Sequence, residues 1–160
     1  MGRFLANTVN SIDKKGRVSV PASFRGVLGG QGVLYTMLSI SAPTIEAGGP
    51  QLIEAAEARL AQMDSFSEEY EVWSFCVHGD SDQLKIDGDG RIILNDAIRE
   101  HAGISDQVAF VGRGHFFQMW EPDKFKTYQQ KTRAKALEMR KRLGERQSAV
   151  AGVVAGGGEH

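Results

Sequence analysis

Residues 13–25 of the chain read Asp13-Lys14-Lys15-Gly16-Arg17-Val18-Ser19-Val20-Pro21-Ala22-Ser23-Phe24-Arg25. The pattern returns 74 positions later, where residues 87–99 read Asp87-Gly88-Asp89-Gly90-Arg91-Ile92-Ile93-Leu94-Asn95-Asp96-Ala97-Ile98-Arg99. Both copies keep an Asp, a Gly, an Arg, alternating apolar residues and a final Arg. A short unit with one apolar stripe cannot bury that stripe alone. The repeat therefore predicts two units that pack on each other about a pseudo-two-fold axis.

The residues around each copy predict a strand-rich module. Residues 8–12 and 17–20 have strand character and flank a turn, which predicts a β-hairpin. Asp13 and Gly16 are the turn-forming residues, because Asp bonds nearby backbone amides and Gly accepts a positive φ. A short helix and a strand at residues 32–40 follow. The second copy repeats this order around its own turn-forming residues, Asp87 and Gly90, with strands at 84–86, 91–94, 108–111 and 116–120 and a short helix at 96–102.

Each copy is followed by an amphipathic helix that begins at a proline, Pro50 or Pro122. Ser65 and Glu68 resemble a capping box, which predicts a further short helix leading into the second copy. From Ala149 onward the chain is rich in Gly and small residues, which predicts a frayed tail. The expected organisation is a first module at 5–51, a helical connector at 52–80, a second module at 81–124, a basic C-terminal helix at 125–147 and a flexible tail at 148–160.

The composition is that of a globular protein. Of the 160 residues, 41% are hydrophobic and 24% are charged, which excludes a wholly disordered chain. No apolar run approaches the roughly 18–20 residues of a membrane span, and residues 1–10 lack the apolar stretch of a signal peptide. We therefore expect a cytoplasmic protein without a membrane partner. Cys76 is the only cysteine, so an internal disulfide or a cysteine-based zinc site is excluded.

Charge is unevenly distributed along the chain, although the net charge is only -1. Residues 1–25 carry five basic groups and one acid, residues 46–82 carry nine acids and one Arg, and residues 124–146 carry nine basic groups and two acids. Local charge sets what a surface attracts. The N-terminal region is thus the first candidate for a contact with a polyanion.

The first turn concentrates these cations. Lys14, Lys15 and Arg17 lie on it, with Arg3 nearby in sequence, and such groups gain affinity for DNA by displacing counterions. We predict that this turn contacts double-stranded DNA. The second turn has Gly88 and Asp89 in place of the lysines, so we expect Arg91 to contribute less. An alternative is that both turns are purely structural, with Arg pairing to Asp.

The sequence does not support a metal-binding or catalytic site. An EF-hand that starts at Asp87 fails because its fifth position is Arg91 and its twelfth is Ile98. The pair Cys76 and His78 lacks the third group of a nucleophilic site, and the remaining histidines have no metal-ligand spacing. We therefore predict no enzyme activity, no catalytic residue, no metal, no cofactor and no small-molecule substrate.

The chain resembles the MraZ family. The resemblance rests on the two copies in order, the Gly79-Asp80-Ser81-Asp82 approach to the second, the segment Arg99-Glu100-His101-Ala102-Gly103-Ile104, and Trp120-Glu121 after the Phe116-Phe117 strand. It implies an α+β fold in which two SpoVT-AbrB modules form a duplicated swapped-hairpin β-barrel with flanking helices. It also implies a nucleoid-associated regulator, usually a repressor, that binds direct repeats upstream of the division and cell-wall gene cluster as a ring-shaped homo-oligomer. The family's DNA-contacting Asp-x-x-x-Arg element falls on Asp13 and Arg17, and again on Asp87 and Arg91.

Two other functions stay open at this point. An AbrB-like antitoxin would bind DNA but act mainly on a partner protein through its tail, and a pure assembly protein would not bind DNA at all. The basic stretch at 124–146 is either a solvated face or a contact with DNA or with the acidic residues 54–71 of a neighbouring subunit.

Overall fold

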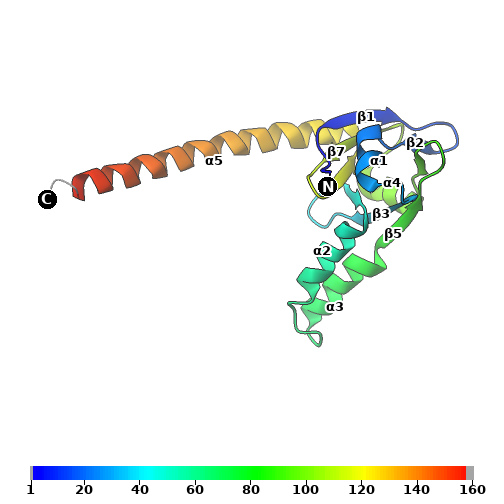
Figure 1. Ribbon diagram of the computed structural model, residues 1–160, viewed down its shortest axis with the longest axis horizontal. Coiled ribbons are helices and arrows are strands. Elements are labelled where there is room, and N and C mark those ends of the chain that lie inside the picture. The colour runs from blue at the N-terminus through cyan, green and yellow to red at the C-terminus, as the bar shows by residue number, and fades with distance from the viewer. Residues whose placement is uncertain (1, 158–160) are drawn as a thin grey trace. The chain divides into compact units, whose positions relative to one another are not determined.

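The computed structural model describes residues 2–157, which divide into two compact units, one up to Pro122 and one from Asp123. The described residues form eight β-strands, five α-helices and one π-helical turn (Figure 1). The predicted strand-rich α+β class is therefore confirmed. None of the described helices is long and apolar enough to cross a membrane.

The first unit contains every described helix and strand except the last helix. Its first half consists of β1 (Asn7–Ser11), β2 (Arg17–Ser19), α1 (Ala22–Leu28), β3 (Val33–Leu38) and β4 (Ile45–Gly48). A helical connector follows, with α2 (Pro50–Leu60), α3 (Glu68–Ser74) and the π-helical η1 (Phe75–Gly79). The second half repeats the first with β5 (Ser81–Lys85), β6 (Arg91–Ile93), α4 (Asp96–Ala102), β7 (Gln107–Gly112) and β8 (Phe117–Trp120).

The strand order is symmetric with respect to the repeat. The larger sheet runs β1-β7-β8-β4-β3-β5, and the smaller sheet consists of β2 and β6. The equivalent strands of the two halves are β1 and β5, β3 and β7, and β4 and β8. When each strand is replaced by its equivalent, the same order results, read from the opposite edge of the sheet. All pairings are antiparallel. The two halves are therefore interleaved rather than placed side by side.

The predicted β-hairpin is wrong. β1 does not pair with β2: β1 pairs with β7, and β2 pairs with β6 of the other half. The turn residues are compatible with either arrangement, because they determine how the chain reverses and not which strand completes each ladder. The resemblance implied a swapped-hairpin β-barrel; no closed barrel is found among the described residues, since the larger sheet ends at β1 on one side and β5 on the other.

The main core lies between these interleaved elements. Val18 and Ile92, the middle residues of β2 and β6, are each 1% exposed and point inward. Phe4, Phe24 and Phe117 stack around one another with ring centroids 4.9–5.3 Å apart. Both halves contribute to this single core, so neither half has a complete core of its own.

A second, smaller core holds the connector helices. It consists of Met37, Leu52, Leu60 and Val77, and Figure 1 shows α2 and α3 as a helical hairpin that projects from the sheet. The N-cap of α3 is Ser67, whose Oγ accepts a hydrogen bond from the Tyr70 N–H at 3.1 Å. The predicted cap at Ser65 is thus displaced by two residues.

The helix α5 (Pro122–Gly157) makes up the described part of the second unit, which it enters at Asp123. It begins at the predicted proline but continues ten residues beyond the predicted end at 147. The helix therefore includes the first part of the segment expected as a tail, and the flexibility of that segment stays a prediction. Residues 158–160 of that tail lie outside the described residues. Leu137, Met139 and Leu143 are exposed on α5.

Candidate nucleic-acid interface

Turn 1, residues 13–17, is organised by one carboxylate. Oδ1 of Asp13 accepts hydrogen bonds from the backbone N–H groups of Lys15 and Arg17, both at 2.9 Å. Oδ2 of the same residue accepts from Nε of Arg17 at 2.8 Å. The backbone N–H of Gly16 donates to the Asp13 carbonyl at 3.0 Å, which closes the turn. Asp13 therefore fixes both the backbone and the direction of the Arg17 side chain.

Turn 2, residues 87–91, has the same geometry. Oδ1 of Asp87 accepts from the N–H groups of Asp89 and Arg91 at 2.9 Å, and Oδ2 accepts from Nε of Arg91 at 3.1 Å. One bond has no counterpart in turn 1, since Nη2 of Arg91 also donates to Oδ2 of Asp89 at 3.1 Å. The two turns thus match in shape and differ in charge.

The electrostatics of the two carboxylates agree with this geometry. Backbone N–H donation from Arg17 is the largest influence on Asp13 and lowers the pKa of its carboxyl, with further help from the Arg17 side chain. The pKa of Asp87 is lowered in the same way, chiefly by the N–H of Arg91. Both carboxylates are therefore ionised at neutral pH and keep their arginines in place.

Each turn is supported by an arginine from the other half of the repeat. A Cβ on Gly90 would lie 2.5 Å from Cδ of Arg25, and Nε of Arg25 donates to the Val20 carbonyl at 3.1 Å. A Cβ on Gly16 would lie 4.0 Å from an Nη atom of Arg99. The sequence repeat ends in these two arginines, but sequence alone did not indicate that they lie at the opposite turns.

The ribbon formed by β2 and β6 joins the two turns. Arg17 lies opposite Ile93 and Ser19 lies opposite Arg91, so both turn arginines are on one face of the ribbon. The backbone N–H of Val20 donates to the Gly90 carbonyl at 2.9 Å, which ties the end of β2 to turn 2. The structure therefore brings Arg17 and Arg91 together on one outward surface.

The predicted cations differ in how available they are. Lys14 and Lys15 are exposed and, within the part of the chain that the structure describes, form no ion pair shorter than 4.0 Å. Arg17 uses Nε for Asp13, whereas Arg91 uses both Nε and Nη2 for two carboxylates. Turn 1 thus presents three cations against one acid, while turn 2 presents one cation against two acids, both of which pair with it.

Arg3 is not brought to this surface. It is exposed, and the bridge between Phe4 and Gly114 holds the beginning of the chain at the end of β1 that is remote from turn 1. The predicted contact of Arg3 with DNA stays a prediction.

Comparisons with known proteins identify the lineage of the chain. The family described as "MraZ protein, putative antitoxin-like" matches residues 78–146. The curated "Transcriptional regulator MraZ" of Rhizobium meliloti is 45% identical over 148 residues, which cover 91% of this chain and 99% of that protein. The chain belongs to the MraZ family. The proteins of the same name from Rhizobium johnstonii and Beijerinckia indica are 44% and 40% identical, each over 91% of this chain and over 99% and 90% of their own lengths.

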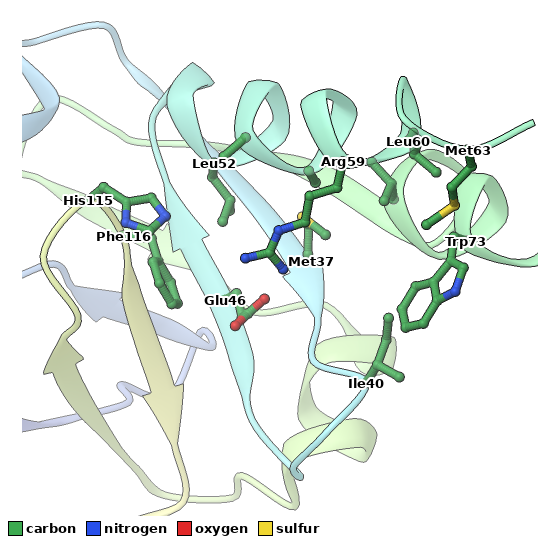
Figure 2. A pocket seen from close by; sticks show the side chains of 13 residues that line it. Met37, Ile40, Glu46, Leu52, Arg59, Leu60, Met63, Trp73, His115 and Phe116 are labelled. Carbon is green, nitrogen blue, oxygen red and sulfur yellow. The ribbon is translucent and has the colours of Figure 1, made fainter. Parts of the chain in front are cut away.

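This MraZ-family chain also has a cavity that the sequence did not predict. It has a volume of about 330 Å³ and lies between the helical hairpin and strands β3 and β4. Figure 2 shows Trp73 and Ile40 at one end and the guanidinium of Arg59 directed towards the carboxylate of Glu46. Burial raises the pKa of Glu46, and the positive charges of Arg113 and Arg59 oppose that shift. Because the charges in the lining offset one another, electrostatics favours neither a cationic nor an anionic ligand.

Proposed function

We propose that this protein is a sequence-specific DNA-binding transcriptional regulator that contacts DNA through turn 1. Its curated relatives are transcriptional regulators by name, and they match almost the whole chain. The observation that carries the proposal is the contrast between two turns of equal geometry, of which only turn 1 presents cations that are not neutralised locally. A turn with a purely structural role would not need Lys14 and Lys15.

The cations of turn 1 bind different parts of the DNA. Lys14 and Lys15 bind phosphates, since an ammonium group is a point charge that suits the DNA backbone. Arg17 reads a base edge: Asp13 holds its Nε, and the outer nitrogens are then oriented to donate to N7 and O6 of a guanine. Turn 2 contributes less, because Arg91 is already held by two carboxylates.

Assembly supplies the affinity that one turn lacks. A few phosphate contacts bind weakly, and several identical turns on one particle gain affinity by avidity when the DNA repeats are in phase with them. We therefore propose a ring-shaped homo-oligomer that binds direct repeats upstream of the division and cell-wall gene cluster, as a repressor in the nucleoid. The exchange of strands between the two halves supports a swapped-hairpin arrangement of AbrB type for the protomer.

Charge complementarity offers a contact between copies in such an assembly. Residues 54–71 of the connector carry six acids and Arg59, and residues 124–146 of α5 carry nine basic groups and two acids. Opposite charges on two different surfaces favour head-to-tail association. This contact predicts that the particle dissociates as the salt concentration rises, and a mass that is constant up to high salt would argue against it.

The binding assay that tests the function compares the DNA upstream of the protein's own gene with unrelated DNA at one salt concentration. The proposal predicts preference for the upstream DNA and a loss of about 5- to 100-fold in affinity for Arg17→Ala, the range of one bidentate base contact. Arg91→Ala is the matched control in turn 2 and is expected to change affinity much less. Equal binding to both DNAs, or an Arg17→Ala variant that binds like the wild type, would refute the proposal.

The antitoxin alternative has one observation in its favour, the description of the matching family. An antitoxin needs a segment that folds on its partner. Residues 149–160 are too rich in Gly to provide a short apolar segment of that kind. DNA binding that depends on Arg17 favours the regulator.

A further inference from the structure

The outward face of the β2–β6 ribbon carries four side chains. Arg17 and Ser19 come from β2, and Arg91 and Ile93 come from β6, because the alternate residues Val18 and Ile92 point into the core. Ser19 and Ile93 are exposed, and Ile93 is 59% exposed. This ribbon face is therefore a small surface with two arginines, a hydroxyl and an uncovered aliphatic side chain.

The repeat relates these four residues in pairs, and one pair breaks the symmetry. Arg17 corresponds to Arg91, whereas Ser19 corresponds to Ile93. In the register of the ribbon, Ile93 is directly opposite Arg17, where Cβ atoms are about 4.5–5.5 Å apart. Ser19 is opposite Arg91, the arginine that two carboxylates neutralise. Ile93 thus lies beside Arg17, whose outer nitrogens form no ion pair within the described residues. Ser19 lies beside Arg91, whose guanidinium is held by two carboxylates.

A two-stranded ribbon of this kind fits the major groove of B-DNA, where side chains on its outward face reach base edges. The major-groove edge of thymine presents a methyl group, and apolar side chains recognise it by direct packing. The guanine edge is the partner of an arginine fork.

We propose that Ile93 is a specificity-determining residue, which packs on the methyl group of a thymine beside the base that Arg17 reads. This inference rests on the proposed function. It gives the second half of the repeat a role in recognition that its neutralised turn does not have. One protomer then reads DNA with a composite pair, Arg17 from the first half and Ile93 from the second.

The test replaces thymine by deoxyuridine, which lacks only the methyl group, in the upstream DNA. We expect the wild type to bind the substituted DNA about fourfold more weakly for each thymine contacted, the value of one buried methyl group. Ile93→Ser, which restores the residue of the first copy, is expected to bind both DNAs equally and as weakly as the wild type binds the substituted DNA. The thermal midpoint of Ile93→Ser should stay near that of the wild type, because the side chain is exposed.

Val9→Ser is the matched control, since Val9 is an exposed β-branched residue on a strand outside the ribbon, at 47% exposure. It should keep the wild-type ratio between thymine and deoxyuridine DNA. The inference is overturned if the wild type does not distinguish the two DNAs, if Ile93→Ser keeps the wild-type ratio, or if Ile93→Ser dissociates the particle, which would show that a second copy covers Ile93. Failure of the proposed function is separate: it would appear as equal binding of the wild type to upstream and unrelated DNA.

Discussion

At the scale of single residues, Asp13 and Asp87 each organise a turn by accepting two backbone N–H groups and the Nε of an arginine. The role of Asp and Gly in these turns could be predicted from sequence, because turn geometry depends on local conformational preferences. The crossing of Arg25 to Gly90 could not, since nothing in a repeat indicates which copy of the turn each helix faces.

The two turn glycines lead to different predictions. Gly16 and Gly90 have φ values of 82° and 79°, so Ala at either position costs about 1–2 kcal/mol of unfolding free energy. Gly90→Ala should cost about 1 kcal/mol more, because its Cβ displaces the Arg25 side chain and its hydrogen bond to Val20. Urea denaturation of both variants measures the difference. In an Arg25→Ala background the two glycine substitutions should cost the same, and a persistent difference would contradict the assigned contact.

Glu46 predicts a pH-dependent stability. Its pKa is raised by burial, so the folded state disfavours the ionised form, and stability is lost as pH rises from the unfolded value of about 4.3 through the folded value. Glu46→Gln should therefore increase the free energy of unfolding at pH 7, by no more than about 1 kcal/mol because the side chain is partly solvated. Below about pH 4 the two proteins should be equally stable. Denaturation curves of both proteins at several pH values test this prediction. A stabilisation by Glu46→Gln that is greatest at acid pH would contradict it.

At the scale of elements, the helices that follow the two turns begin differently. Pro21 precedes α1 without a side-chain cap, whereas Oδ1 of Asn95 accepts from the N–H of Ile98 at 3.0 Å at the beginning of α4. Most strands were predicted from alternating apolar residues. β4 was not, because Glu46, Ala47 and Gly48 have low strand propensity and the segment is held by ladders to β3 and β8 on its two sides.

Asn95 provides the prediction for this scale. Asn95→Ala removes the cap and the hydrogen bond from Nδ2 to Asp82, which measures 2.9 Å, and should cost about 1–2 kcal/mol of stability. Asn95→Ser keeps a capping oxygen and should recover most of that loss. Thermal unfolding of the two variants decides, and equal losses would show that the cap contributes nothing.

At the scale of the whole molecule, the repeat predicted two halves packed on each other. The strand order agrees with this prediction, because equivalent strands of the two halves occupy symmetric places in one sheet. The pairing of β1 with β2 was wrong, and no closed barrel is found among the described residues. Both depend on which distant strands meet, and the sequence of a duplicated unit is equally compatible with pairing inside a copy and between copies.

The shared core predicts a single unfolding transition for the first unit. Phe24 and Ile98, one from each half, are both 2% exposed in the same core. Phe24→Ala and Ile98→Ala should each cost about 2–5 kcal/mol and lower one common midpoint. Tryptophan fluorescence follows this unit, since Trp73 and Trp120 both lie in it. A variant that unfolds in two steps would show that the halves are independent.

The central claim is that turn 1 makes the main contact with DNA and that the equally shaped turn 2 contributes less. The measurement that tests it most directly is the slope of log affinity against log salt for the upstream DNA, compared between the wild type, the double variant Lys14→Ala/Lys15→Ala and Arg91→Ala. Each lost phosphate contact reduces the slope by about 0.9. The double variant should lose about two such contacts for each protomer bound, while Arg91→Ala should change the slope much less. Equal slopes for the wild type and the double variant, or an equal loss in both variants, would contradict the account.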